Sequence, residues 1–282
     1  MTDRDRHDLP TVRPLAGSRW RCDAAAAEPI ERWAPEETPI GLSYDSEPYA
    51  VLMATPADVV DLALGFTLTE RIASPEDVLD VRVSEQGGGL TADILLTKAG
   101  AARVLDRRRR TLEGRSSCGL CGLQNPQDAL RDLPRLPPGL VVAPQAIQGA
   151  LAALDRQQPL GAQTRATHAA AWASAEGEVL LIREDVGRHN ALDKLIGAAG
   201  RAGLDPSAAF AVITSRCSYE MVEKAALAGL AMIVAISAPT ALAVQKAEAA
   251  DMTLVGLARH DGHTVFAGPD RIRDPLRPFA VA

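Results

Sequence analysis

The stretch AFAVITSRCSYEMVEKAALAGLAMIVAISAPTALAVQKAEAADMTLVGLA, residues 209–258, alternates short apolar runs with amphipathic segments. Three apolar, partly β-branched runs are typical of buried strands, namely 209–215, 232–237 and 252–258. The segments between them, 219–229 and 240–250, carry apolar residues at helical spacing. Because strands alternate with helices, this stretch predicts right-handed βαβ crossovers and a largely parallel, buried sheet.

The residues before this stretch add elements of both kinds to the predicted sheet. They comprise a helix over 144–157, strands over 167–174 and 178–184, and a helix over 188–203 that ends at a glycine. We therefore predict a C-terminal lobe of the α/β class over residues 145–282, with a mainly parallel or mixed sheet.

The N-terminal part has a different pattern, in which apolar runs flank turn residues. Runs around DSEP (45–48) and GGG (87–89) predict two β-hairpins, over 38–54 and 79–97. A helical pattern follows each hairpin, at 57–70, with Thr55 as the expected cap, and at 99–110. These elements predict a smaller α+β lobe over residues 36–110.

Two segments lack a regular pattern. Residues 1–35 mix Pro, Arg, Asp and an alanine run, which predicts a mobile N-terminal arm followed by an edge strand. Residues 111–144 hold two cysteines, several glycines and the turn-rich LPRLPPG, which predicts a flexible loop between the two lobes.

Composition narrows the class of protein. With 282 residues, 47% of them hydrophobic, the chain can bury a large core. A net charge of -6 and a pI of about 5.5 argue against a protein that coats nucleic acid, which needs a broadly positive face. The sequence shows no apolar run long enough for a membrane span and no hydrophobic signal core at its start, so we expect a cytoplasmic protein that does not enter a membrane.

Polar residues gather where the predicted strands end. ITSRCSYE (213–220), ISAPTAL (236–242) and GLARHDGH (256–263) follow three neighbouring strands, whose carboxyl ends should share one edge of the sheet. Serine and threonine can cap the following helices there, and arginine can add positive charge. The candidate ligand contacts at these junctions are Ser215, Arg216, Ser237 and Arg259. The alternative is that the junctions hold helix caps alone, but three on one edge favour a phosphate-bearing ligand.

A fourth junction, REDVGRHNALDK (183–194), is the richest in different polar groups, and it adds His189 to the candidate contacts. A merely structural turn seldom needs so many polar side chains, so the segment is a candidate functional region. His168 begins the strand THAAA beside alanines. For a lone histidine in that position, a hydrogen-bonded core residue is the favoured interpretation over a catalyst.

The segment SSCGLCG pairs Cys118 with Cys121, and only Cys22 and Cys217 exist besides them. Three chemistries use two sulfurs at this spacing: metal ligation, dithiol exchange and sulfur transfer. One pair leaves a four-ligand zinc site short of ligands, and no strand–helix context supports a thioredoxin-type motif. Six arginines between Arg103 and Arg115 favour a thiolate and could hold an anionic partner, which suits sulfur transfer. The residues alone leave the three chemistries open.

Several motifs together resemble the FdhD/NarQ family, whose members are sulfur carriers required for formate dehydrogenase activity. They are SCGLCG (117–122), THAAA (167–171), EDVGRHNALDKLIG (184–197), TSRCSYEMVEKAALAG (214–229), ISAPTALAV (236–244) and TLVGLAR (253–259). The resemblance extends from about Pro39 to His263. It implies a three-layer cytidine-deaminase-like fold without a zinc site, and a homodimer.

The resemblance also implies a reaction and its residues. A cysteine desulfurase supplies sulfur as a persulfide on Cys118, with Cys121 assisting, and the sulfur passes to the bis(molybdopterin guanine dinucleotide) molybdenum cofactor. That cofactor is then inserted into the catalytic subunit of formate dehydrogenase, and GDP is a possible mimic of it. The family's cofactor-binding stretch matches LARHDG, which is Leu257, Ala258, Arg259, His260, Asp261 and Gly262. The alternatives are a cofactor chaperone or a structural zinc protein without sulfur transfer.

Overall fold

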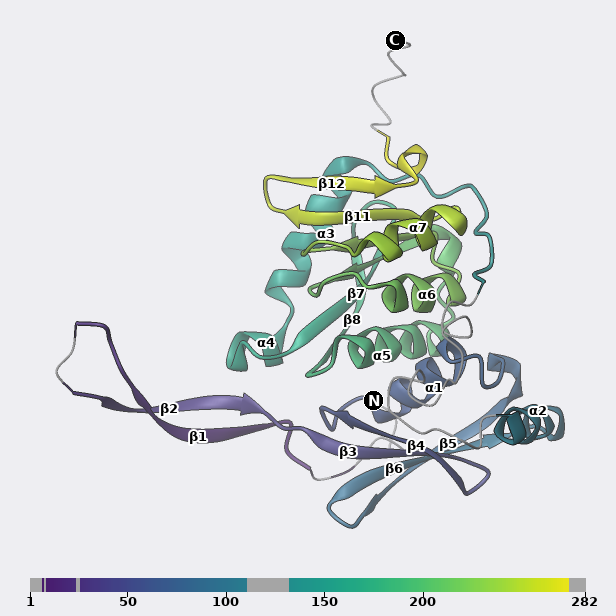
Figure 1. Cartoon of the computed structure of the whole chain (residues 1–282), viewed down its shortest axis with the longest axis horizontal. Coiled ribbons are helices and arrows are strands. Elements are labelled where there is room, and N and C mark those ends of the chain that lie inside the picture. The colour runs from purple at the N-terminus through teal and green to yellow at the C-terminus, as the bar shows by residue number, and fades with distance from the viewer. Residues whose placement is uncertain (1–6, 8, 24–25, 111–131, 274–282) are drawn as a thin grey trace, which may run out of the picture.

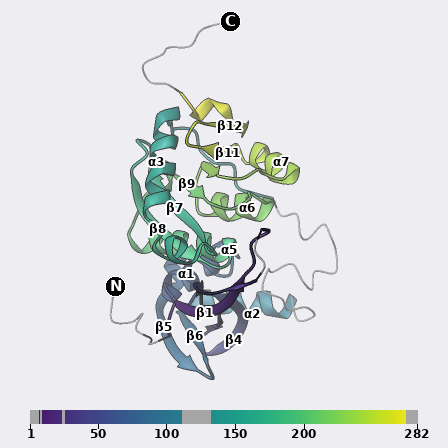
Figure 2. The same cartoon turned by 90° about the vertical axis from the view of Figure 1, so that its left-hand side faces the viewer.

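The computed structural model describes residues 7, 9–23, 26–110 and 132–273, which form two lobes and a projecting arm (Figure 1). The N-terminal lobe lies below the C-terminal lobe in that view, and helices from both meet between the two sheets. Figure 2, turned by 90°, shows the same stacking of the two lobes from the side.

The N-terminal lobe is a four-stranded sheet with the order β4-β3-β6-β5. Its strands are β3 (Thr38–Tyr44), β4 (Glu47–Ala54), β5 (Val78–Gln86) and β6 (Gly89–Leu96). Both predicted hairpins are confirmed, since β3 pairs antiparallel with β4 and β5 with β6. Gly87 and Gly88 take positive φ angles of 61° and 81° at the second turn, which glycine adopts without strain. The lobe core includes fully buried Ile40, Leu62 and Ile94.

Two helices complete this lobe, α1 (Val59–Thr69) and α2 (Lys98–Arg110), and a short 3-10 turn spans Pro75–Asp77. The expectation that Thr55 caps α1 is wrong. Asp58 occupies the cap position with a left-handed backbone, φ 52°, while the backbone N–H of Thr55 donates to Asp185 of the other lobe at 3.0 Å. A local capping preference thus gave way to a contact between lobes.

The C-terminal lobe holds a six-stranded sheet with the order β12-β11-β10-β9-β7-β8. Its strands are β7 (His168–Ser174), β8 (Val179–Asp185), β9 (Ala209–Ile213), β10 (Met232–Ala235), β11 (Thr253–Arg259) and β12 (Gly262–Ala267). Strands β9, β10 and β11 are parallel, as the βαβ pattern predicts. The sheet is mixed, as the prediction allowed, and not largely parallel, because β7 runs antiparallel to β8 and β9, and β12 to β11. Short turns join β7 to β8 and β11 to β12, and a short turn forces antiparallel pairing.

Helices cover both faces of this sheet, so the predicted three-layer arrangement is confirmed (Figure 1). On one face lie α5 (Arg188–Arg201), α6 (Tyr219–Leu227) and α7 (Ala241–Ala249), and on the other lies α3 (Pro144–Arg156). A short helix, α4 (Pro159–Thr164), precedes β7, and 3-10 turns span Pro206–Ala208 and Pro269–Arg271. Small residues such as Ala170, Ala211 and Ala235 let the helices approach the strands closely.

The N-terminal arm is a hairpin of β1 (Val12–Arg19) and β2 (Glu28–Pro35), paired antiparallel along their full length. The prediction of an arm with a single edge strand is wrong, because the arm contains two strands. The sequence did not reveal them, since their residues are mostly exposed and show no apolar alternation. The hairpin extends away from both lobes in Figure 1, and α4 contacts β2.

The predicted loop of residues 111–144 is described from residue 132 onward. Leu136, Leu140 and Val142 are buried, and the Leu136 N–H donates to the Ala250 carbonyl at 2.9 Å. The segment therefore packs on the C-terminal lobe well before the predicted end of the loop. No helix in the described ranges is long and apolar enough to cross a membrane.

Candidate functional site

We use the name strand-end edge for the carboxyl ends of β9, β10 and β11 with the residues that follow them, and for His168, Arg188 and His189 beside them. Backbone hydrogen bonds join these segments. Ile236 N–H donates to the Ile213 carbonyl at 3.0 Å, and Leu257 N–H donates to the Ser237 carbonyl at 3.2 Å. The prediction that three strand ends share one edge is confirmed.

Helices α5, α6 and α7 all begin at the strand-end edge, because each follows a strand that ends there. The Thr240 hydroxyl accepts from Ala243 N–H at 3.2 Å and so caps α7. Ser218 stands at the cap position of α6 but makes no side-chain cap bond, and the Ser215 hydroxyl donates to the Arg216 carbonyl instead. The free N–H groups and partial positive charge of these helix starts favour an anion.

Residues 257–262 form the end of β11 and the turn into β12. A β-bulge lies between Gly256 and Arg259, and Leu257 has a positive φ of 51°, which a leucine seldom adopts. The bulge turns the Leu257 side chain outward, where it is 46% exposed, while Ala258 is buried. An Arg259 guanidinium N–H donates to the Ile236 carbonyl of the neighbouring strand end. His260, Asp261 and Gly262 lie in or beside the exposed turn.

The remaining candidate contacts lie along the same edge. Arg216 is exposed and Ser237 is half-buried. His189, near the start of α5, pairs its Nε2 with Glu220 Oε2 at 3.0 Å, and this hydrogen bond lowers the pKa of Glu220. The structure thus brings Ser215, Arg216, Ser237, His189 and the 257–262 turn to one side of the sheet.

The predicted carrier residues, Cys118 and Cys121, lie outside the described residues. Of the nearby arginines, Arg103 is described, and its guanidinium pairs with Asp77. Cys217 is fully buried, which raises its pKa to about 12 and keeps it a neutral thiol. The interpretation of Cys217 as a small buried residue is confirmed.

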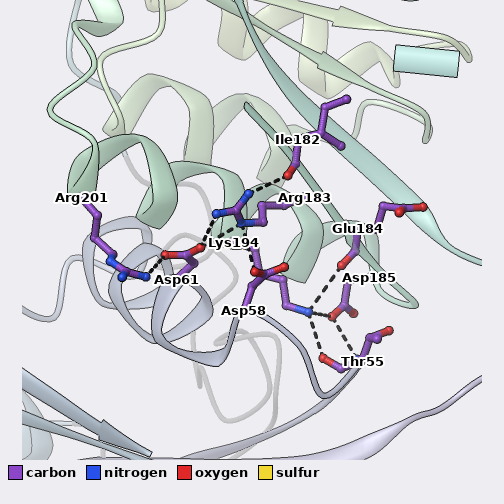
Figure 3. A network of polar contacts seen from close by, with 9 residues as sticks. All are labelled: Thr55, Asp58, Asp61, Ile182, Arg183, Glu184, Asp185, Lys194 and Arg201. Carbon is purple, nitrogen blue, oxygen red and sulfur yellow. Dashed lines mark hydrogen bonds and ion pairs between the residues drawn. The ribbon is translucent and has the colours of Figure 1, made fainter. Parts of the chain in front are cut away.

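The polar segment 183–194 divides between the edge and a second region, which we name the lobe junction. Figure 3 shows the part of it around Asp61 and Lys194. The lobe junction comprises Thr55, Asp58, Asp61, Thr69, Glu70, Arg183, Asp185, Asp193, Lys194, Arg201 and Lys224. At its centre, Lys194 Nζ lies 2.6 Å from Asp185 Oδ2, and both side chains are fully buried. Lys194 also donates to the Thr55 carbonyl at 2.9 Å. This ion pair therefore ties the C-terminal lobe to the end of β4.

Other polar residues of the segment are also structural. Asp185 Oδ1 accepts from Gly187 N–H at 2.8 Å and from Asn190 Nδ2 at 3.0 Å, and Asn190 reaches the Met53 carbonyl. Glu184 accepts from the Leu160 and Gly161 N–H groups at the start of α4. Sequence reasoning missed these roles, since Met53 lies 137 residues before Asn190 and Leu160 lies 24 residues before Glu184. Arg188 and His189 lie in the first turn of α5, which begins at the strand-end edge.

Charge pairing continues between helices α1 and α5. Asp61, 2% exposed, accepts from Arg183 Nη2 at 2.7 Å and from Arg201 Nη1 at 2.7 Å. Lys224 Nζ donates to Asp193 Oδ2 at 2.9 Å and to Thr69 Oγ1 at 2.9 Å. Burial disfavours the charge of Lys224, but the carboxylates of Asp193 and Glu70 outweigh it and raise the pKa of Lys224.

Glycines let these two helices touch. A Cβ on Gly65 would lie 1.8 Å from the Asp193 carbonyl oxygen, and one on Gly197 would lie 2.0 Å from that of Asp61. Neither position has room for a side chain, so the junction is a close-packed scaffold. A pocket of about 440 Å³ lies beside it, lined mainly by apolar residues of α1, β5 and α5 such as Leu64, Val81 and Ile196.

Among the residues that the structure describes, no three His, Cys, Asp or Glu side chains gather where they could hold a metal ion. A zinc site would therefore need Cys118 and Cys121 and further ligands near them.

Comparison with known proteins gives three findings. A family profile described as the FdhD/NarQ family matches residues 35–273. The "Sulfur carrier protein FdhD" of Xanthomonas euvesicatoria pv. vesicatoria (strain 85-10) is 50% identical over 265 residues, which is 93% of this chain and 91% of that protein. The protein of the same description from Bordetella petrii is 44% identical over 244 residues, or 86% of this chain and 87% of the relative.

A solved structure has the same fold. It is the crystal structure of a protein from Desulfotalea psychrophila that is assigned as a formate dehydrogenase accessory protein. It superposes with a TM-score of 0.76 at 22% identity, covering 94% of this chain and 100% of that chain. The mixed α/β architecture is therefore shared, and the cytidine-deaminase-like relationship stays a prediction.

Proposed function

The chain belongs to the FdhD/NarQ family, and we propose that it is a sulfur carrier required for formate dehydrogenase activity. The observation that carries this proposal is 50% identity, over 93% of the chain, to a protein described as a sulfur carrier. Identity at that level over nearly the whole length favours a shared activity. In this proposal the chain acts as a persulfide sulfurtransferase.

The proposed carrier is Cys118. Its thiolate attacks the sulfane sulfur of a cysteine persulfide held by a cysteine desulfurase. A new S–S bond forms at Cys118 while the bond between that sulfur and the donor cysteine breaks, and the donor cysteine leaves as a thiolate. The electron pair of the broken S–S bond leaves with the donor thiolate, and the new bond uses a lone pair of the Cys118 thiolate, so the exchange consumes no oxidant. Cys121, three residues on, assists the relay.

We further propose that the strand-end edge binds the substrate that receives the sulfur, the bis(molybdopterin guanine dinucleotide) molybdenum cofactor. The nucleotide arms of that substrate carry diphosphate groups. Arg216, Arg259 and the starts of α6 and α7 supply the positive charge and free N–H groups that diphosphates need. The outward Leu257 offers an apolar contact for a base. GDP should therefore mimic one arm of the substrate.

The proposal implies two protein partners, a cysteine desulfurase as donor and the catalytic subunit of formate dehydrogenase as recipient of the cofactor. We also propose, from the family resemblance, a homodimer located in the cytoplasm.

The opposing possibility is a binding protein that holds the cofactor, or a zinc ion, without carrying sulfur. In that case Cys118 and Cys121 act as metal ligands, and metal would be lost when either is removed.

A mass measurement separates these possibilities. The full chain is incubated with cysteine and a cysteine desulfurase, and the peptide that contains Cys118 is weighed without reduction. We expect the mass of one added sulfur atom on this peptide and none in the Cys118→Ala variant. Cys217→Ala is the matched control and should load normally, because its thiol is buried and neutral. Equal loading of Cys118→Ala, or no loading of the native chain, would contradict the carrier role.

A further inference from the structure

Arg188, at the first position of α5, has no ion-paired carboxylate among the residues that the structure describes. It is half-buried, and its Nε is buried with no hydrogen-bond partner in the described part of the chain. The two carboxylates nearest along these elements are occupied, Asp185 by Lys194 and Glu220 by His189. A cation withdrawn from water without a partner is costly, and elsewhere in this lobe the half-buried and buried cations Arg183, Lys194 and Lys224 are ion-paired. Arg271 lacks an ion pair too, but its guanidinium donates to the Pro137 carbonyl at 3.0 Å, whereas Arg188 makes neither contact within the residues described. The exception points to an anion that comes from outside the chain.

His168 lies beside this arginine at the start of β7. It stands opposite Asp185 in the register of β8, and its neighbour Ala169 binds Thr214 at the end of β9. The ring is half-buried, and within residues 7, 9–23, 26–110 and 132–273 no hydrogen bond to it is formed. The favoured interpretation from the sequence, a hydrogen-bonded core histidine, is therefore not what the structure shows.

Burial and the nearby charges lower the pKa of His168 and so favour its neutral form. Burial is the main reason that its pKa is lowered, the positive charges of Arg188 and His189 lower it further, and Asp185 opposes them. Asp185 is itself paired with Lys194, and His189 with Glu220. An imidazole held neutral beside an unpaired guanidinium can take up a proton as soon as a negative group arrives.

This pair is well separated from the 257–262 turn. His168 is on β7 and the turn follows β11, with β9 and β10 between them in the sheet. Three strand spacings of nearly 5 Å place the two positions about 14 Å apart. Phosphates bound at the turn cannot also satisfy Arg188, so the strand-end edge has two places for anionic groups.

We propose that Arg188 and His168 form a second phosphate subsite at the α5 end of the strand-end edge, which binds the diphosphate of a nucleotide. The inference rests on the proposed function in one respect, that the diphosphate belongs to a nucleotide. Arg188 supplies the fixed charge, His168 adds a proton-dependent hydrogen bond, and the free N–H groups at the start of α5 face the same place.

The subsite has a defined pH dependence. A bound diphosphate stabilises the imidazolium form and so raises the pKa of His168 above its lowered value in the free protein. Binding at this subsite therefore takes up a proton, and its affinity increases as the pH falls from 8 to 6.

The test is an NMR titration of the histidine ring signals in the full chain, with inorganic pyrophosphate as the probe. The His168 signal is the one lost in His168→Gln. We expect the pKa of His168 to rise by about one unit at saturation. Arg188→Gln should weaken the affinity for pyrophosphate, followed through this signal, about tenfold. Arg259→Ala should leave the His168 response unchanged. His263, whose pKa is lowered by burial and whose Nδ1 pairs with Gln148, is the internal control that should not respond.

Three outcomes would overturn the subsite: an unchanged His168 titration with saturating pyrophosphate, a native response in Arg188→Gln, or loss of the response in Arg259→Ala. Should any of these occur while GDP still binds and Arg259→Ala weakens that binding, the subsite fails and the proposed cofactor edge stands. Absence of binding by both GDP and pyrophosphate would instead remove the edge itself and the subsite with it.

Discussion

The lobe junction and the strand-end edge both draw on helix α5 and the segment 183–194, but they treat charge in opposite ways. At the junction, Lys194, Arg183 and Lys224 each lie within 3 Å of a carboxylate oxygen. At the edge, Arg216 and Arg188 have no carboxylate partner among the residues described, and Arg259 binds a backbone carbonyl. Both regions are polar. What distinguishes them is that the cations of the junction are paired with carboxylates, whereas these arginines of the edge are free to bind an anion.

The largest expected effect on stability comes from breaking the buried pair of the junction. Lys194→Met leaves Asp185 as an uncompensated buried charge and should cost about 3–5 kcal/mol of unfolding free energy. Denaturant unfolding measures it. The double variant Lys194→Met with Asp185→Asn removes both charges and should recover part of the loss. A loss below about 1 kcal/mol for Lys194→Met alone would show that the buried ion pair does not stabilise the junction.

The next effect comes from the close contact of α1 and α5. Gly197→Ala places a methyl group 2.0 Å from the Asp61 carbonyl oxygen and should destabilise the protein by about 1–3 kcal/mol. Gly200→Ala is the matched control, because no atom lies within 4 Å of its added Cβ and alanine favours the helix. Thermal unfolding of the two variants should differ in sign. A similar shift for both would contradict the close-packed junction.

A smaller loss is expected at the edge, where one hydroxyl supports a helix. Thr240→Ala removes the cap of α7 and should cost about 1 kcal/mol. Ser218→Ala, at the equivalent position of α6, makes no side-chain cap bond and should cost less than about 0.5 kcal/mol. Equal losses of unfolding free energy for the two variants would show that the cap hydrogen bond of Thr240 does not stabilise its helix more than Ser218 does.

The smallest effect is expected for the unpaired arginine. Arg188→Gln removes no ion pair that the described residues form, so the unfolding free energy should change by less than about 0.5 kcal/mol in the absence of ligand. A loss of unfolding free energy comparable to that of Lys194→Met would show that Arg188 stabilises the fold, and would contradict the contrast between the two regions.

Sequence reasoning located the edge because its signals are local. Ser215, Ser237 and Arg259 each follow an apolar run directly, and parallel strands bring such ends together. The junction could not be found this way, since Lys194 binds the carbonyl of Thr55, 139 residues earlier. The polar residues of 183–194 signalled importance but not that Asp185, Asn190 and Lys194 hold the lobes together.

Strand direction and the arm show two further limits of local patterns. Apolar runs predict strands, but the antiparallel course of β7 and β12 depends on turn length and on which neighbour each strand meets. In the arm, β1 and β2 stabilise each other through backbone pairing with mostly exposed side chains, so no alternation marks them.

The contrast between edge and junction is tested most directly by calorimetric titration of GDP into a matched pair of arginine variants. Arg259→Ala should weaken GDP binding about tenfold and leave the melting temperature of the free protein near the native value. Arg183→Ala uncovers the buried carboxylate of Asp61, so it should lower the melting temperature and leave GDP affinity unchanged. Native GDP affinity in Arg259→Ala, or a loss of affinity confined to Arg183→Ala, would contradict the assignment of the strand-end edge as the binding surface.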